Sequence, residues 1–177
     1  MAMLIGYNDI VDTVVAMIEA DSAFDITDTA TRYIQQLLDQ RKIPGPPLPA
    51  VLVYMAAKEE GASAHTSIGY SPSPILEVAI EVMVGLPGPC PAALKTALGL
   101  STDITTPREA DKAACFIIDK IESLFRADPR MSDALAPNET WYAIPGRTTF
   151  HEQNHSGQDI ISAQHLLGVR IRLIERA

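Results

Sequence analysis

The sequence has little cysteine and no long apolar run. Its two cysteines are Cys90 and Cys115, and a chain of 177 residues can bury a hydrophobic core without disulfide bonds. Cys115 falls within a helical pattern, so we expect two free thiols and a reducing cytoplasm. No segment approaches the roughly 18 consecutive apolar residues of a membrane span. The start, MAMLIGYNDIVD, lacks the basic region and cleavage site of a secretory signal, so none is expected.

Positive charge is also scarce. The chain has 14 Lys and Arg residues against 22 Asp and Glu residues, which gives a formal net charge of −8. Proteins that bind nucleic acid tightly do so through basic residues that displace counterions from the phosphates. The excess of acidic residues therefore argues against a nucleic-acid-binding role. An acidic surface would still let DNA pass without binding it.

Motifs for phosphate binding and nucleophilic catalysis are missing. The chain has neither a P-loop nor a G-x-G-x-x-G fingerprint, and no G-x-S-x-G follows a strand pattern. Glu77 and Glu81 share one face of a predicted strand, but a solvated or intersubunit face explains them better than a catalytic pair of carboxylates. We therefore expect no enzyme activity and no cofactor.

One short motif points to metal chemistry. Residues 151–155 read HEQNH and match H-E-x-x-H, in which two histidines on a helix bind zinc beside a glutamate. The context favours a strand, because TTF precedes the motif and a glycine follows it. On a strand His151 and His155 lie about 13 Å apart, too far for one ion. Neither His165 nor Glu175 completes a longer zinc signature. A small zinc metallopeptidase that uses His151 and His155 is the first alternative function.

The strongest structural pattern is a long central helix over about residues 107–126. Thr106 and Glu109 form a capping box, and Pro107 occupies the first helical position. Asp128, which precedes a proline, ends the pattern. Apolar residues recur at helical spacing and form one stripe, which comprises Ala114, Ile117, Ile118, Ile121, Leu124 and Phe125. A helix with such a stripe must cover another surface.

Two shorter helices are predicted before it. Asp9 caps the first, whose apolar face comprises Ile10, Val11, Val14, Val15 and Ile18. Thr27 caps the second, whose apolar face comprises Ala30, Tyr33, Ile34, Leu37 and Leu38. The proline-rich residues 43–49 follow as an extended connector.

The middle of the chain predicts two antiparallel strands joined by a long arm. Residues 50–56 and 75–84 are rich in β-branched and other apolar side chains. Alternate residues of the second strand form one apolar face, namely Leu76, Val78, Ile80 and Val82. Residues 57–74 have no apolar period and many Gly, Ser and Pro, which indicates an extended arm.

The next segments are predicted to be mostly irregular. Residues 85–105 form an insertion, in which Pro91 opens a short helix that runs through Leu98 and stops at Gly99. Residues 128–147 follow the central helix, and Trp141 is expected to anchor them by burying its ring.

The chain ends in a predicted hairpin that turns at residues 155–159. In its last strand Val169, Ile171 and Leu173 alternate with Arg170 and Arg172. Together these patterns predict one α+β domain over residues 1–177. We expect a small, mostly antiparallel sheet, packed by two N-terminal helices and the long central helix.

Four stretches carry a resemblance to a known family. They are RYIQQLLDQRKIPGPPLPAVLVYMAAKEE, SPILEVAIEVMV, READKAACFIIDKIESLFRAD and GVRIRLI. In this order they resemble the tail terminator, or tail completion, proteins of long-tailed bacteriophages, in particular the lambda minor tail protein U family. The resemblance covers about residues 28–177 and rests on element order and hydrophobic pattern. The first helix, near residues 9–20, and the long insertion of residues 85–105 depart from the family pattern.

The resemblance implies a structural protein of a phage or prophage virion. Such a protein assembles in the host cytoplasm as a ring, expected to be a hexamer, on the last disk of the tail tube. The ring ends tail assembly and prepares the tail for head joining. Its expected partners are its own copies, the tail tube protein and the head–tail connector protein. DNA passes through the ring without specific binding, and no membrane is involved.

Candidate protein contacts lie in the arm and in the last strand. They are Glu59, Glu60, His65, Tyr70, Arg170 and Arg172. A mobile arm and a solvated strand face would explain the same residues without any contact. A monomeric adaptor that binds another protein through the arm is the second alternative function.

Overall fold

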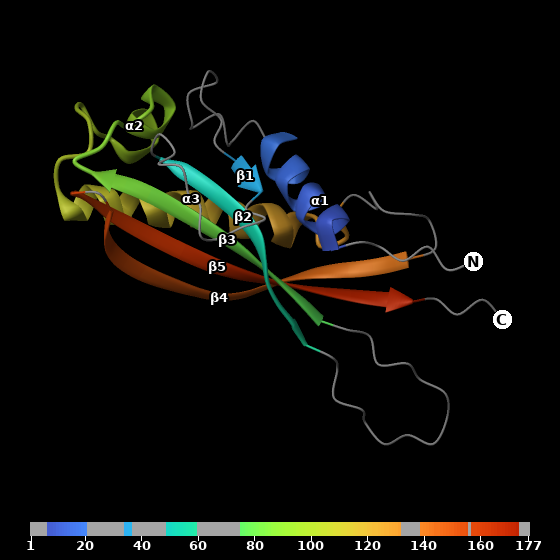
Figure 1. Cartoon of the computed structure of the whole chain (residues 1–177). Coiled ribbons are helices and arrows are strands. Elements are labelled where there is room, and N and C mark those ends of the chain that lie inside the picture. The colour runs from blue at the N-terminus through green and yellow to red at the C-terminus, as the bar shows by residue number, and fades with distance from the viewer. Residues whose placement is uncertain are drawn as a thin grey trace.

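A computed structural model describes residues 7–20, 34–36, 49–59, 75–131, 139–155 and 157–173. The elements in chain order are α1 (Tyr7–Ala20), β1 (Ile34–Gln36), β2 (Ala50–Glu59), β3 (Ile75–Leu86), α2 (Ala92–Leu98), α3 (Pro107–Ala127), β4 (Glu139–His155) and β5 (Gln158–Leu173). The strands form one sheet in the order β1-β2-β3-β5-β4. Neighbours in it are antiparallel, except that β1 runs parallel to β2. Helices α1 and α3 pack on one face of this sheet (Figure 1), which confirms the predicted α+β fold.

Helix α3 begins with the predicted capping box. The Thr106 side chain accepts a hydrogen bond from the Glu109 backbone N–H at 3.3 Å. The Glu109 carboxylate accepts in return from the backbone N–H groups of Thr106 at 3.0 Å and Thr105 at 2.9 Å. These bonds satisfy donors that a helix start leaves unpaired, and they lower the pKa of Glu109 because they favour its charged form. The helix runs to Ala127, one residue beyond the predicted end.

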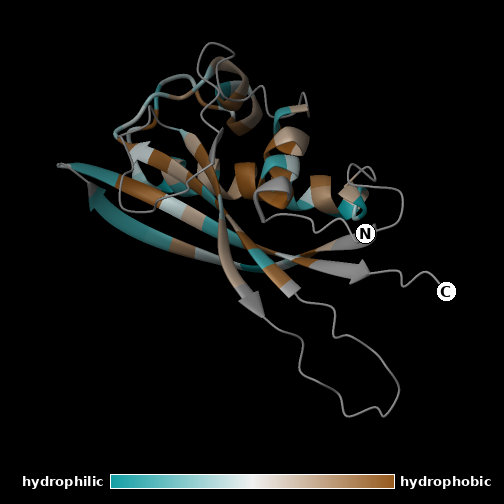
Figure 2. Cartoon of the chain, turned by 45° about the vertical axis from the view of Figure 1, so that its right-hand side comes forward, coloured by the Kyte–Doolittle hydropathy of each residue, from teal (hydrophilic) through white to brown (hydrophobic). Residues whose placement is uncertain are grey.

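One hydrophobic core lies between the helices and the sheet. The brown bands of Figure 2 mark apolar residues along α3 and the strands, and those of α3 belong to one buried cluster with residues of the sheet. The buried residues of α3 are Ala110, Ala113, Ala114, Ile117, Ile118, Ile121 and Phe125. From the sheet, β3 contributes Leu76, Val78, Ile80, Val82 and Val84 to the same cluster, and α1 contributes Ile10, Val11, Val14 and Ile18. Each large side chain that leaves water here stabilises the fold by about 1.5–3 kcal/mol before the entropy cost.

The predicted second N-terminal helix is wrong where the structure describes it. Residues 34–36 form strand β1, in which Ile34 pairs with Val51 and Gln36 with Val53. Parallel pairing with the edge of β2 gives these residues backbone hydrogen bonds that a helix would otherwise supply, so tertiary context overrides the local helical pattern. The other residues of that prediction, including its Thr27 cap, lie outside the described residues.

The strands are longer than the sequence indicated. Strand β2 continues to Glu59 and pairs with β3 on both sides of a bulge between Met55 and Ala57, so residues 57–59 of the predicted arm belong to the sheet. Strand β4 begins at Glu139, and the predicted irregular stretch is therefore strand over residues 139–147. Its long partner β5 aligns these residues despite Pro145, because a bulge between Pro145 and Thr148 takes up the irregularity. Trp141 occupies a position in β4, and its side chain lies outside the described residues.

The insertion of residues 85–105 contains ordered elements. Its first two residues complete β3, and α2 follows Pro91 as predicted and ends at Gly99, whose φ of 70° is left-handed. Gly88 and Ile104 then exchange two backbone hydrogen bonds of 3.0 Å, which close the insertion on itself. Among the described residues, no helix is long and apolar enough to cross a membrane.

Introducing a charge into the α3 stripe should abolish folding. Ile121 is fully buried against the sheet, so Ile121→Asp places an unpaired carboxylate in the core, as does Ile117→Asp. Ile121→Ala should cost about 2–5 kcal/mol of unfolding free energy. The exposed Lys112 provides the control, because Lys112→Asp should leave the urea midpoint nearly unchanged. A folded, soluble Ile121→Asp protein would show that the helix face is assigned wrongly.

Removing the α3 cap should have a smaller, local effect. Thr106→Ala deletes the side-chain acceptor for the Glu109 N–H and should lower the unfolding free energy by about 1 kcal/mol. Thr106→Ser keeps that acceptor and should stay close to the parent protein. Chemical denaturation of the three proteins measures the difference, and equal stabilities for the Ala and Ser variants would contradict the role of the cap.

Candidate functional site

The HEQNH motif lies on strand β4, as its sequence context predicted. His151 pairs with Ser162 and His155 with Gln158 across the β4–β5 hairpin. The His151 ring contacts Thr149 Oγ1 at 3.2 Å, and His151, Glu152 and Gln153 are exposed. The motif therefore lacks the helix that would bring both imidazoles to one ion. Within the described ranges, no group of three or more His, Cys, Asp or Glu side chains is placed to hold a metal.

The predicted contact residues are placed only in part. Glu59 ends β2 opposite Ile75, and Arg170 and Arg172 lie in β5 opposite positions of β4. The side chains of these three residues lie outside what the structure describes, and so do Glu60, His65 and Tyr70 entirely. Their role in protein contacts stays a prediction.

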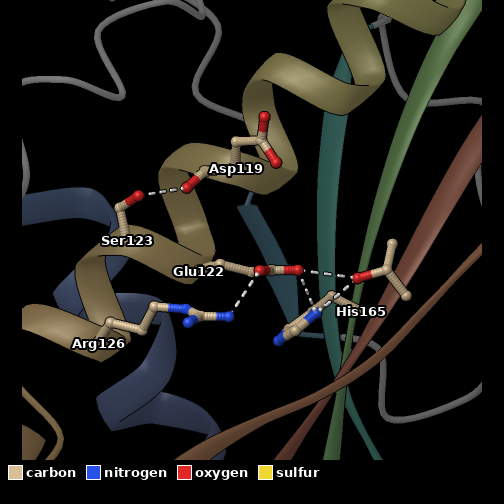
Figure 3. Close-up of polar contacts among 6 residues, drawn as sticks. Asp119, Glu122, Ser123, Arg126 and His165 are labelled. Atoms are coloured by element: carbon tan, nitrogen blue, oxygen red, sulfur yellow. Dashed lines mark hydrogen bonds and ion pairs between the residues drawn. The ribbon is translucent and has the colours of Figure 1, made fainter.

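Sequence reasoning missed a buried polar cluster between α3 and the hairpin. It consists of His165 from β5, Thr148 from β4 and Glu122 from α3. The His165 ring is fully buried, with Nδ1 2.9 Å from Thr148 Oγ1 and 3.2 Å from Glu122 Oε1. Thr148 Oγ1 donates to Glu122 Oε1 at 3.0 Å. Figure 3 shows Glu122 reaching from the helix toward His165, with Arg126 on its other side at 3.5 Å.

These contacts fix the tautomer of His165. The single Thr148 hydroxyl hydrogen goes to Glu122, so His165 Nδ1 must carry the hydrogen that faces the Thr148 oxygen and the carboxylate. Nε2 is then an acceptor, and it is buried without a hydrogen-bond partner. Burial lowers the pKa of His165; Glu122 opposes this shift, and Arg126 adds to it. The cluster thus holds a neutral imidazole beside a carboxylate.

This cluster joins elements rather than presenting a reactive group. His165 has no exposed surface, so a substrate could not reach its Nε2 without opening the core. Its hydrogen bonds tie α3 to β4 at Thr148, the residue where pairing with β5 resumes after the bulge. The sequence did contain a signal for it. In β5, Ile161, Ala163 and Leu167 alternate on the core side, and His165 occupies the one polar position in that series.

The opposite face of the sheet has a second polar group. Tyr54 donates to Glu81 Oε2 at 3.3 Å and accepts from Gln164 Nε2 at 2.6 Å. Burial and then the charge of Glu81 raise the pKa of Tyr54. Leu52, Met83 and Ile160 form a small buried cluster on the same face. Glu81 is therefore partly exposed and hydrogen-bonded to a tyrosine of the neighbouring strand.

Strand β4 forms one edge of the sheet, and its two halves differ. Before the bulge, the Ala143 N–H donates to Pro129 O at 2.8 Å, and Pro145 has no N–H. After the bulge, residues 148–154 carry no lysine and no proline. We call residues 148–154 the free edge. Phe150 lies within it with 53% of its surface exposed, one of two large exposed hydrophobic residues in the described structure.

The buried histidine should make stability depend on pH. In the unfolded chain a histidine has a pKa of about 6.5. Because the folded pKa is lower, the unfolded state binds the proton first, so this contribution is complete above about pH 6.5 and is lost as the pH falls. The slope is at most about 1.4 kcal/mol per pH unit for one proton.

Urea unfolding at pH 7 and pH 5 should reveal this dependence. His165→Leu removes the titrating group, leaves Glu122 bonded to Thr148, and should flatten the change between the two pH values. His151→Gln, at an exposed position, serves as the control and should keep the parental change. An unaltered pH response in His165→Leu would show that His165 does not stay neutral in the fold.

Comparison with known proteins assigns no family to the chain. No protein-family model matches it, and no curated protein matches its sequence.

Proposed function

We propose that the chain is a structural subunit of a phage or prophage tail. In this role it caps the tail tube as a ring, and its partners are its own copies, the tail tube protein and the head–tail connector protein. The order of elements supports the proposal. A strand pair, a capped helix and a terminal hairpin follow one another as in the tail terminator family that the sequence resembles.

The observation that carries the proposal is the paired base of the arm. Strands β2 and β3 pair as far as Glu59 and Ile75, with one bulge between Met55 and Ala57, and the pair extends away from the helix layer in Figure 1. The connection between these two residues therefore starts and ends on a two-stranded ribbon that is continuous with the core. A subunit that contacts its neighbours through residues 57–74 needs such a fixed base.

Charge is consistent with the same role. With a net charge of −8, the chain would repel the DNA backbone, so a ring of such subunits could surround DNA without holding it.

The two alternative functions require other structures or other behaviour in solution. A zinc metallopeptidase needs a helix at HEQNH, whereas those residues form β4. A monomeric adaptor would show no self-association.

The first experiment is the mass of the purified chain in solution, alone and mixed with a tail tube protein. A ring of defined stoichiometry, alone or on the tube, is the expected result. A particle that stays monomeric under both conditions would contradict the proposed function.

Shortening the arm should separate folding from assembly. Replacing residues 60–74 with a short Gly/Ser turn joins Glu59 and Ile75, which already pair, so the circular dichroism spectrum and unfolding midpoint should be retained. Ring formation or tube binding should weaken, because the proposed contacts Glu60, His65 and Tyr70 are gone. A control that replaces the same residues with a Gly/Ser segment of equal length separates loss of contacts from loss of length. An unfolded shortened protein would show that the arm is part of the core.

A further inference from the structure

Among the residues that the structure describes, none bonds to the outward-pointing backbone groups of the free edge of β4. The Ala143 N–H bonds to Pro129 and so points away from β5. In an antiparallel ladder every second residue points the same way, and across the bulge this set continues with Thr148, Phe150, Glu152 and Asn154. In the part of the chain that the structure describes, no strand lies beyond β4. A run of unpaired N–H and C=O groups is a template for a further strand.

The usual protections of a sheet edge are confined to the first half of β4. There, Pro145, the bulge and the contact with Pro129 block pairing. The free edge has no lysine and no proline, and it includes the half-exposed Phe150. Glu152 is the one Asp, Glu, Lys or Arg residue within it. Such an edge favours association with another strand.

We propose that the free edge of β4 pairs with the same edge of a second copy of the chain, antiparallel, about a two-fold axis at Phe150. The two sheets then become one continuous sheet. Phe150 lies opposite Phe150 of the second copy, Thr148 lies opposite Glu152, and Thr149 lies opposite His151. The contact is isologous, so both copies use the same residues.

Side-chain chemistry selects this register from its neighbours. An axis at His151 would place Phe150 opposite Glu152, and an axis at Glu152 would place two carboxylates opposite each other. With the axis at Phe150, an aromatic pair forms at the centre and each Glu152 lies opposite the uncharged Thr148, whose hydroxyl remains bonded to Glu122. No like charges are opposed in this register. The edge is therefore complementary to itself, which is the reason to choose a second copy over an unrelated peptide.

This contact goes beyond the proposed ring. An isologous contact joins copies in pairs and cannot run head to tail around a ring, so it involves a different surface from the arm. The pairing predicts a dimer of the isolated chain, or two rings joined through β4 edges. It does not depend on whether the ring exists.

Sedimentation velocity over a range of protein concentrations tests the contact. The shortened-arm protein, which lacks the proposed ring contacts, should still dimerise. In that background Phe150→Glu should raise the dimer dissociation constant by at least about 100-fold, because two buried aromatic rings are lost and two carboxylates meet at the axis. Ile144→Glu is the matched control: Ile144 lies in the same strand with 51% exposure, but before the bulge, and its change should leave the constant within about twofold.

Cysteine cross-linking tests the register. Thr149 and His151 would form a non-hydrogen-bonded pair, with Cα atoms about 4.5 Å apart, within disulfide range. In a Cys115→Ser background, Thr149→Cys combined with His151→Cys should give a covalent dimer on mild oxidation, and neither single variant should. A covalent dimer from His151→Cys alone would overturn the axis at Phe150. A monomeric parent protein, or dimers that persist in Phe150→Glu, would overturn the contact itself.

Discussion

The structure depends on the burial of the α3 stripe against one face of the sheet. Ile117, Ile121 and Phe125 are almost fully removed from water there, and α3 packs against β3, β5 and β4. Strands β3 and β5 are neighbours in the sheet, but they belong to different antiparallel pairs, β2–β3 and β4–β5. One helix that covers β3 and β5 therefore holds both pairs together. Apolar packing of this kind is non-directional, so it holds the layers together without fixing how far β4 slides along β5. Directional contacts have to supply that alignment.

The buried cluster of His165, Glu122 and Thr148 supplies one such contact. A half-satisfied polar group in a core costs stability, and the unpartnered Nε2 of His165 shows that this cluster carries such a cost. In return, its three hydrogen-bonding groups come from α3, β4 and β5 and meet in one arrangement. Tyr54, Glu81 and Gln164 tie β2, β3 and β5 together on the other face. The sheet is thus aligned by polar contacts on both sides.

Local patterns predicted the elements whose cause is local. The capping box of Thr106 and Glu109 and the apolar stripe that follows are complete within one stretch of sequence, and both are confirmed. The turn of the last hairpin likewise depends on one short stretch of sequence. Errors arose where a distant partner decides the outcome. Residues 34–36 have a helical pattern but pair with β2, and residues 139–147 look irregular until β5 lies beside them. The polar clusters could not be predicted from the sequence for the same reason, because their members are far apart along the chain. Glu122 and His165, for example, are separated by 43 positions.

The bulge in β4 changes whether odd-numbered or even-numbered residues lie on the core face of the strand. Before it, odd-numbered residues such as Ala143 and Pro145 share the face of the core residues in β5; after it, even-numbered residues such as Thr148 and Phe150 do. Gly146 fits there because a Cβ atom would collide with the carbonyl oxygen of Leu166. An insertion or deletion of one residue beyond the bulge would exchange the two faces of the hairpin tip. Descendants of this chain can therefore change the length of that tip only in steps of two residues on each strand.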